Sequence, residues 1–287
     1  MKNKSRNLKC FESGFAILII TEGGGSINEI LITRADDFGS ANAANAAILK
    51  ALSAGCLVRN VSCMAVGSQI ESGAEALAPW ASQVDLGLHL TVNAEWDCLK
   101  WKPLSPPEAI PALLDEAGNF HQTSLGLERA APPPEQVLRE ANAQLDRLTA
   151  LGLPITYVDG HMFPYLYVPG LEQALRQWCR EKGLLYASAY DGLYQGGPAF
   201  GPTYEAFSEA TDQWLAALDG QTRLYIIHPA QFSPETMVFA NRDFPAGVVA
   251  WERELEYRSA IDPAWTERAA RFGLKLTRFR DLPAAQA

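Results

Sequence analysis

Several features that define other protein classes are missing or scarce in this 287-residue chain. No apolar run approaches the roughly 20 residues that a membrane-spanning helix needs, and the five cysteines contain no C-x-x-C pair. Basic residues are in deficit, because 24 Lys and Arg stand against 33 Asp and Glu, for a net charge of -9. We therefore expect reduced thiols in a cytoplasmic protein that spans no membrane and binds no nucleic acid.

Sequence patterns for several catalytic chemistries are absent as well. The chain has no G-x-S-x-G segment, the strand-to-helix turn that carries a nucleophilic serine. Its glycine clusters at 23–25 and 196–197 do not follow predicted strands in a P-loop or dinucleotide-binding arrangement. These absences argue against serine nucleophiles and nucleotide binding.

The remaining composition is that of an ordinary globular protein, with 48% hydrophobic and 20% charged residues. The chain opens with a basic segment, a short apolar run at 14–20 and the glycine cluster at 23–25. The apolar run is too short to span a membrane and makes a poor signal peptide. We expect residues 1–28 to form a flexible N-terminal extension, followed by a single domain over 29–283.

From residue 29 onward, short apolar segments alternate with helical ones. Strands are expected near 30–37, 60–66, 84–91, 155–159, 186–190, 223–228 and 274–279, with helices near 42–54, 69–82, 135–151, 170–182, 203–218, 252–259 and 263–272. This alternation is typical of a parallel sheet covered by helices. Seven strands in about 250 residues predict an α/β fold, a distorted (β/α) TIM-like barrel. A long irregular loop insertion is expected at 92–134, a length typical of functional lids.

Ionisable side chains gather where the predicted strands end. In a parallel barrel the carboxyl ends of the strands converge on the face that carries the active site, so residues distant in sequence are expected to meet there. Three of the four histidines and three aspartates occupy such positions. They are Asp36, Asp37, His89, Asp159, His161 and His228.

The chemistry of these side chains points to a metal-dependent hydrolase. Two imidazoles and one carboxylate can hold a divalent ion while leaving positions open for water and substrate. The ion would polarise a carbonyl and lower the pKa of its water, while a spare carboxylate serves as base and a spare histidine as acid. Non-haem iron oxygenases share this ligand set, but they need an all-β scaffold that the strand–helix alternation does not provide.

In their order and spacing, the strand-end motifs resemble those of the YdjC-like carbohydrate deacetylases, the family of chitooligosaccharide and hopanoid-biosynthesis deacetylases. The resemblance extends from about Ile30 to Leu282. The motifs are A-D-D-F-G at 35–39, G-L-H-L-T at 87–91, Glu140 with Gln144, V-D-G-H at 158–161 and H-P-A at 228–230. The resemblance implies a distorted barrel that holds one divalent metal ion. It also implies removal of an acetyl group from an N-acetylated sugar or oligosaccharide by metal-activated water.

The resemblance also implies a role for each strand-end residue. Asp36 matches the position of a general base acting on the metal-bound water, and His228 matches a histidine near the leaving amine, a candidate acid. The implied metal ligands are Asp37, His89 and His161.

Behind these ligands, the resemblance implies that Asp159 orients one of the imidazoles, as metal-bound histidines require. Zn or Mg is the expected metal, and Mn, Co and Ni also accept such ligands. Family members are often homodimers, although no segment of this chain predicts a dimer interface.

The chain departs from the family pattern at positions that bear on the substrate. Met162 and Phe163 follow His161 where the family often has further histidines, and Arg59 with Asn60 stands where a Thr-Ser pair is common. We expect the metal site to persist while the substrate contacts differ. Aromatic side chains in the loops around the active face could stack on a sugar, or could instead pack against the protein. The candidate substrate contacts are Arg59, Trp96 and Tyr165, with Trp101 and Tyr167 nearby.

Two alternative functions stay open at this point. The apolar Met162–Phe163 pair suits a metal-dependent amidase or cyclic-amide hydrolase that acts on a non-sugar substrate. A carbohydrate-binding relic without turnover is the second alternative, and the complete set of strand-end residues argues against it. His121, in the long loop, is expected to be a surface histidine rather than a ligand.

Overall fold

The computed structural model describes residues 29–218 and 220–282, so the expected extension over residues 1–28 lies outside the described part. Seven parallel strands form one sheet in the order β5-β4-β3-β2-β1-β6, and β7 pairs with the first half of β1. The strands are β1 (Glu29–Phe38), β2 (Asn60–Cys63), β3 (Asp85–Leu90), β4 (Tyr157–Gly160), β5 (Leu185–Tyr186), β6 (Arg223–Ile227) and β7 (Leu274–Thr277).

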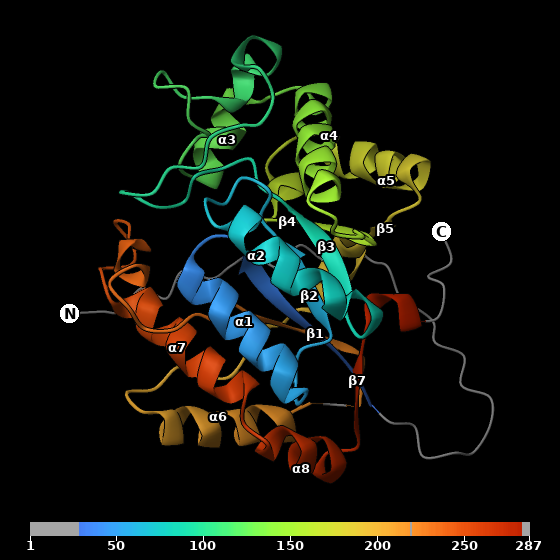
Figure 1. Ribbon diagram of the computed structural model, residues 1–287, viewed down its shortest axis with the longest axis vertical. Helices are drawn as coiled ribbons and strands as arrows, with labels where there is room; N and C mark the ends of the chain where they lie inside the picture. The colour runs from blue at the N-terminus through green and yellow to red at the C-terminus, as the bar shows by residue number, and fades with distance from the viewer. Residues whose placement is uncertain (1–28, 219, 283–287) are drawn as a thin grey trace.

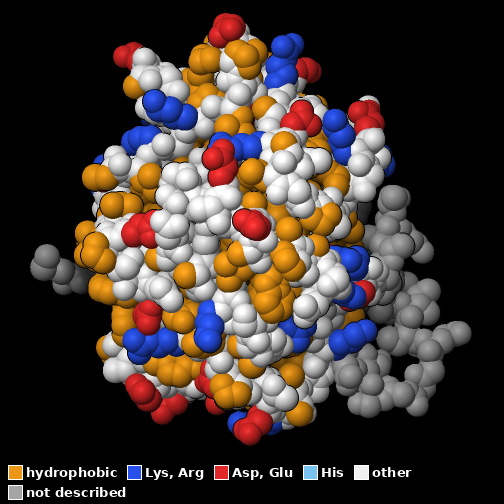
Figure 2. Space-filling model, in the orientation of Figure 1, with side chains coloured by type: hydrophobic (Ala, Val, Ile, Leu, Met, Phe, Trp, Pro, Cys, Tyr) orange, Lys and Arg blue, Asp and Glu red, His pale blue; other side chains and the backbone are white. Residues whose placement is uncertain are grey.

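Helices lie around this sheet. They are α1 (Asn42–Ala54), α2 (Ile70–Leu77), α3 (Ser124–Ala130), α4 (Pro134–Ala150), α5 (Leu171–Lys182), α6 (Tyr204–Ala216), α7 (Val248–Ala260) and α8 (Ala264–Arg271). Figure 1 shows α1 and α2 in front of the sheet, α4 and α5 above it, and α6 and α8 below it. Seen from this side, acidic and basic side chains are interspersed without a large area of one sign (Figure 2). Within the described residues, no helix is both long enough and apolar enough to cross a membrane.

The predicted barrel is confirmed as a curled parallel sheet that stays open on one side. The fifth strand, expected over 186–190, has only the two residues of β5. The chain continues instead as a 3₁₀ segment, Ala187–Leu193, which lies against both β4 and β6. Among the described residues no pairing joins β5 to β6, so side chains rather than backbone hydrogen bonds fill the opening.

The inside of the curled sheet has an apolar floor and a polar upper layer. Alternate residues of a strand face the same side, which places Ile32, Arg34 and Asp36 of β1 above one another on the inner face. Ile32 packs with Tyr157 and Phe279 in a small cluster that is separate from the larger core under the helices. Arg34 and Asp36 lie nearer the carboxyl ends of the strands, where the chemistry was expected.

The long segment after β3 is more ordered than the sequence indicated. It contains α3, which the sequence analysis did not predict and whose N-terminus is capped by the hydroxyl of Thr123. Two buried side chains of α4 bind the backbone of this long segment. Glu140 accepts backbone N–H groups at 104 and 105, and Gln144 bonds both the N–H and the carbonyl of Thr91. These two motif residues thus anchor the loop that borders the site.

Gly87 on β3 leaves room for an aromatic ring inside the sheet. A Cβ built on Gly87 would lie 2.1 Å from the ring of Tyr157, a fully buried side chain. We predict that Gly87→Ala lowers the free energy of unfolding by about 1–3 kcal/mol, the usual cost of overpacking a core. Urea denaturation measures this loss. Gly192→Ala is the matched control because nothing lies within 4 Å of the Cβ built there. Equal stability of the two variants would contradict the prediction.

Candidate metal centre

The register between β3 and β4 sets the orientation of the first imidazole. His89 pairs directly with Asp159 across the two strands, and its Nδ1 lies 2.8 Å from Asp159 Oδ1. The other carboxylate oxygen of Asp159 accepts the hydroxyl of Ser62 at 2.6 Å and lies 3.0 Å from Arg34 Nε. With Nδ1 engaged in this way, Nε2 of His89 is left to face the cavity.

A break in the register of β1 brings two consecutive aspartates to the same place. Neighbouring residues of a regular strand point to opposite faces, but the pairing of β1 with β2 shifts between Ala35 and Phe38. Asp37 sits in this irregularity with a φ of 68°, in the left-handed region. Both Asp36 and Asp37 therefore line the cavity.

Three side chains converge at the carboxyl ends of β1, β3 and β4. Asp37 Oδ1 lies 3.5 Å from His89 Nε2 and 3.6 Å from His161 Nδ1, and the two nitrogens are 3.3 Å apart. All three residues are buried, and Asp37 Oδ1 has no hydrogen-bond partner within the described part of the chain. An unpartnered buried carboxylate oxygen facing two imidazole nitrogens is a donor set that fits a divalent cation.

The charge balance around the cavity also favours a cation. Carboxylates outnumber guanidiniums, because Asp36, Asp37 and Glu95 line the cavity with Arg34 and Arg253, and Asp159 lies directly behind His89.

Burial by itself raises the pKa of Asp37, but Arg253 and His161 overcome this and hold that pKa well below its usual value. Asp37 is therefore ionised and ready to act as a ligand.

The two imidazoles attract protons when no metal competes. Burial lowers the pKa of His89, but the carboxylates of Asp159 and Asp36 outweigh it and raise the pKa above its ordinary value. Burial likewise opposes protonation of His161, whereas the neighbouring carboxylates of Asp37 and Glu95 outweigh it and raise its pKa to about 10. A metal must displace these protons, so metal affinity is expected to weaken as the pH falls.

The cavity has a volume of about 160 Å³, and unusual backbone geometry surrounds it. Four of its lining residues are non-glycine residues with positive φ, namely Asp37, Glu95, Met162 and Phe163. Such conformations cost free energy and cluster at active sites and ligand clamps. Apolar walls come from Met162, Phe163 and Ile226.

The two expected acid–base residues lie on this cavity. Both oxygens of Asp36 accept from Arg34, at 2.7 Å from Nε and 2.9 Å from Nη2. His228 follows β6, and its side chain is 40% exposed at the rim. Its backbone N–H donates to Glu256 Oε2 at 2.7 Å. Loss of hydration lowers the pKa of His228 despite the attraction of Asp37.

The sequence patterns did not reveal the three further charged residues that line the cavity, Arg34, Glu95 and Arg253. The sequence could have indicated Arg34, because an arginine inside an apolar strand needs a buried partner, and Asp36 lies two residues later on the same face. Arg253 reaches the cavity from α7 and donates to Asp37 Oδ2 at 2.7 Å. Glu95 comes from the long loop, with Oε2 3.2 Å from His161 Nε2. Nothing in the sequence distinguishes Arg253 or Glu95 from surface residues.

Two proposed substrate contacts are not brought to the cavity. Arg59 precedes β2 at the opposite end of the sheet, where its Nη1 bonds the carbonyls of Gly55 and Val58. The ring of Trp96 is buried against Phe239, so it offers no open face to a sugar. The proposal that these two residues contact substrate does not fit these positions.

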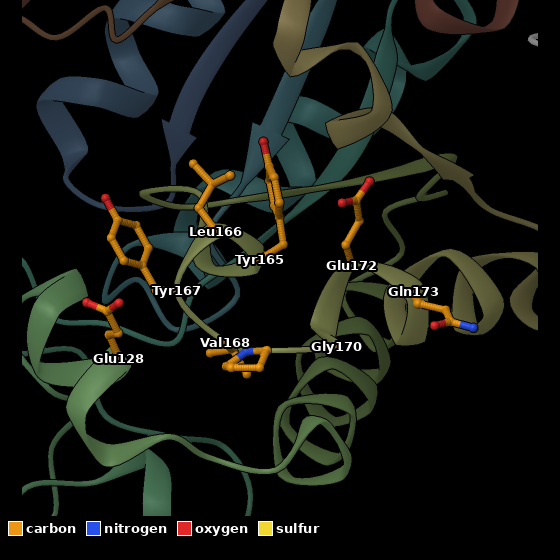
Figure 3. Close-up of a pocket in the computed structure, with 9 residues that line it drawn as sticks. Glu128, Tyr165, Leu166, Tyr167, Val168, Gly170, Glu172 and Gln173 are labelled. Carbon is orange, nitrogen blue, oxygen red and sulfur yellow. The ribbon is translucent and has the colours of Figure 1, made fainter. Parts of the chain in front are cut away.

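Tyr165 lies beside the cavity rather than in it. Its hydroxyl donates to Asp191 Oδ2 at 2.9 Å, and its ring packs edge-on against Phe163. Tyr165 and Tyr167 line a separate surface depression of about 410 Å³ between α3 and α5, where Figure 3 shows them near the Glu128 and Glu172 carboxylates.

Elsewhere in the long loop, His121 Nε2 lies 3.2 Å from the carbonyl oxygen of Ala112. The ring of Trp101 is buried in the main core. Both side chains therefore lie outside the set that lines the metal cavity.

Comparison with known proteins places this fold and site in a family. The family model described as YdjC-like protein matches residues 30–271. The chain belongs to the YdjC-like family. The match spans β1 through α8, and so includes every residue of the metal cavity.

Among individual YdjC relatives, the "Carbohydrate deacetylase" of Thermus thermophilus is 36% identical over 135 residues, 46% of this chain and 43% of that protein. The chain spans about half the length of this and the next curated relatives that it matches. The "Carbohydrate deacetylase" of Vibrio campbellii is 25% identical over 88% of this chain and 96% of its own. A crystal structure from Enterococcus faecalis V583, described as a candidate for cellobiose-phosphate cleavage, has a TM-score of 0.69 at 20% identity. That structural match covers 88% of this chain and 98% of the other, and it shows the shared fold.

Arg34 should be essential for the stability of this YdjC-like interior. We predict that Arg34→Met lowers the free energy of unfolding at pH 7 in chelator by about 3–5 kcal/mol, since it leaves buried carboxylates uncompensated. Urea denaturation provides the measurement. The matched control is Arg147→Met, whose partner Glu71 is 70% exposed; its cost should stay within about 1 kcal/mol.

The stability loss in Arg34→Met should depend on pH in one direction. Burial raises the pKa of Asp159, but Arg34 and His89 overcome it, so the pKa lies below its ordinary value. Ionised Asp159 thus stabilises the wild-type fold above a pH of about 4, and this contribution fades as the pH falls. In the Arg34→Met variant, burial raises the pKa of Asp159 without opposition from Arg34. Protonation of Asp159 then removes the uncompensated buried charge. The difference in free energy of unfolding between wild type and Arg34→Met should therefore shrink from pH 7 toward pH 4. A difference that grows over this range would refute the pairing of Arg34 with Asp159.

Proposed function

We propose that this chain is a metal-dependent hydrolase that removes the acetyl group from an N-acetylated sugar or oligosaccharide. The observation that carries the proposal is the convergence of Asp37 Oδ1, His89 Nε2 and His161 Nδ1, all within 4.8 Å of one another, beside Asp36, which lines the same cavity. Family membership and the names of the curated relatives support the sugar as substrate. The nitrogen-rich ligand set favours Zn over Mg, which prefers oxygen ligands.

The residues of the chain divide the work of amide hydrolysis. Asp37, His89 and His161 would hold the metal, which would supply Lewis acidity to polarise the amide carbonyl and lower the pKa of a bound water. Asp36 accepts the proton of the attacking water. The two hydrogen bonds from Arg34 hold this carboxylate in place and leave its remaining lone pairs for that proton.

His228, which also lines the cavity, would act as the acid that protonates the leaving amine. Its side chain is partly exposed at the rim of the cavity, so the sugar could remain outside while the acyl group enters the cavity. The lowered pKa of His228 makes its protonated form a stronger acid toward the basic leaving amine, and it also predicts that this acid is lost as the pH rises toward neutrality. The apolar side chains of Met162, Phe163 and Ile226 can receive the acetyl methyl group.

The same apolar wall favours a second candidate function. A metal-dependent amidase acting on a non-sugar substrate would also use Met162 and Phe163 to bind an apolar acyl or aryl group. The two functions share the metal centre and differ in the group outside the cavity, so only a substrate panel separates them.

Acetate release from N-acetylated mono- and oligosaccharides tests the leading proposal. We expect release to stop in chelator and to return when Zn, Mn, Co, Ni or Mg is added, with Zn the most effective. The panel should include small aromatic amides as the competing substrates. Turnover of those amides alone would favour the second candidate, and bound metal with no turnover of either class would leave a binding protein.

Substitutions should separate metal binding from proton transfer. His89→Ala should lose metal and activity together, whereas Asp36→Asn should retain metal and lose about 10²-fold or more in kcat, the usual scale for a general base. Metal content by atomic absorption and acetate release are measured on the same samples. Full activity of Asp36→Asn would refute the assignment of the base.

A further inference from the structure

The two imidazoles of the candidate metal centre present different nitrogens to it. His89 faces Asp37 Oδ1 through Nε2, and its Nδ1 contacts Asp159 at 2.8 Å. His161 faces the same oxygen through Nδ1 at 3.6 Å, so its Nε2 points away from the centre. That outer nitrogen is buried, has no hydrogen-bond partner among the described residues, and lies 3.2 Å from Oε2 of Glu95.

The backbone around Glu95 holds its carboxylate at this position. Its N–H donates to the carbonyl of Gln122 at 2.8 Å, and its own carbonyl accepts from the side chain of Asn241 at 3.3 Å. Its φ of 57° is rare for a residue with a side chain and is maintained only by surrounding structure. The next residue, Trp96, is buried against Phe239 and fastens the loop to the segment before α7.

A carboxylate behind the outer nitrogen of a metal-bound histidine fixes which nitrogen carries the proton and raises the basicity of the ligand. Asp159 stands in that relation to His89, with its Oδ1 2.8 Å from Nδ1. Glu95 stands in the same relation to His161. The side-chain exposure of Glu95 is only 16%, so water competes weakly for its carboxylate.

We propose that Glu95 is a positioning residue that holds His161 as an Nδ1 ligand with its proton on Nε2, while His89 binds through Nε2. This inference rests on the proposed metal-dependent function. Glu95 lies behind the imidazole and acts on the reaction through His161, without contacting the reacting atoms.

Long-range ¹H–¹⁵N correlation spectra of the Zn-loaded protein labelled at histidine test the proposal directly. His161 should show Nδ1 bound to metal and a proton on Nε2, and His89 should show the opposite arrangement; substitution of each histidine assigns the signals. Both histidines bound through Nε2 would overturn the role of Glu95 while leaving the metal centre intact. Failure to bind any of the proposed metals would instead sink the proposed function.

Variants supply a second readout that does not depend on turnover. Glu95→Ala should weaken Zn affinity by about 10- to 100-fold, the usual effect of losing such a partner, and Glu95→Gln, which keeps an acceptor oxygen, should restore most of it. Asp97→Asn is the matched control, because it changes the same charge two residues away, where the carboxylate bonds Gln122. Competition with a chromophoric chelator measures affinity. Wild-type affinity in Glu95→Ala would refute the proposal, as would an equal loss in the control.

Discussion

The polar interior of this protein depends on the ion pairs that the guanidinium of Arg34 makes with two buried carboxylates. The guanidinium binds both oxygens of Asp36 and lies within 3.0 Å of Asp159, so one buried cation compensates two buried anions. Asp159 in turn orients His89, so the proposed base and one of the proposed metal ligands share one electrostatic support. Removing a charge from water costs several kcal/mol unless well-aligned hydrogen bonds to an opposite charge compensate for it. Arg34 provides such bonds through its bidentate contact with Asp36.

The other two proposed ligands, Asp37 and His161, have supports of the same kind from other parts of the fold. Arg253 of α7 holds the second oxygen of Asp37, and Glu95 of the long loop faces the outer nitrogen of His161. Each ligand thus has an outer partner on a different element. A site assembled in this way cannot form until β1, β3, β4, the loop and α7 have come together, which links the metal centre to the completed fold.

The open side of the sheet allows an irregular segment to reach the interior. A closed barrel would need a full fifth strand, but β5 has two residues and a 3₁₀ segment takes its place. That segment carries Asp191, which contacts Tyr165 and lies 3.5 Å from Arg34. Polar side chains therefore reach the interior from an irregular segment, where a regular strand would have to alternate its faces.

The sequence by itself determined the alternation of strands and helices, the family and the strand-end set from Asp36 to His228. Such features are recoverable because hydrophobic period and motif order are local, and parallel strands bring their carboxyl ends to one face. It did not predict α3 or the shortness of β5, since packing against neighbours decides whether a short segment becomes helix, strand or turn.

Only the tertiary structure decided how the side chains meet. The register shift in β1 turns both Asp36 and Asp37 into the cavity, and the pairing of His89 with Asp159 selects the nitrogen that faces it. Contacts between residues far apart in sequence placed Arg253 and Glu95 at the site and kept Arg59 and Trp96 away from it. A single sequence carries the identity of each side chain, but the partner that sets its charge and orientation is known only when the chain has folded.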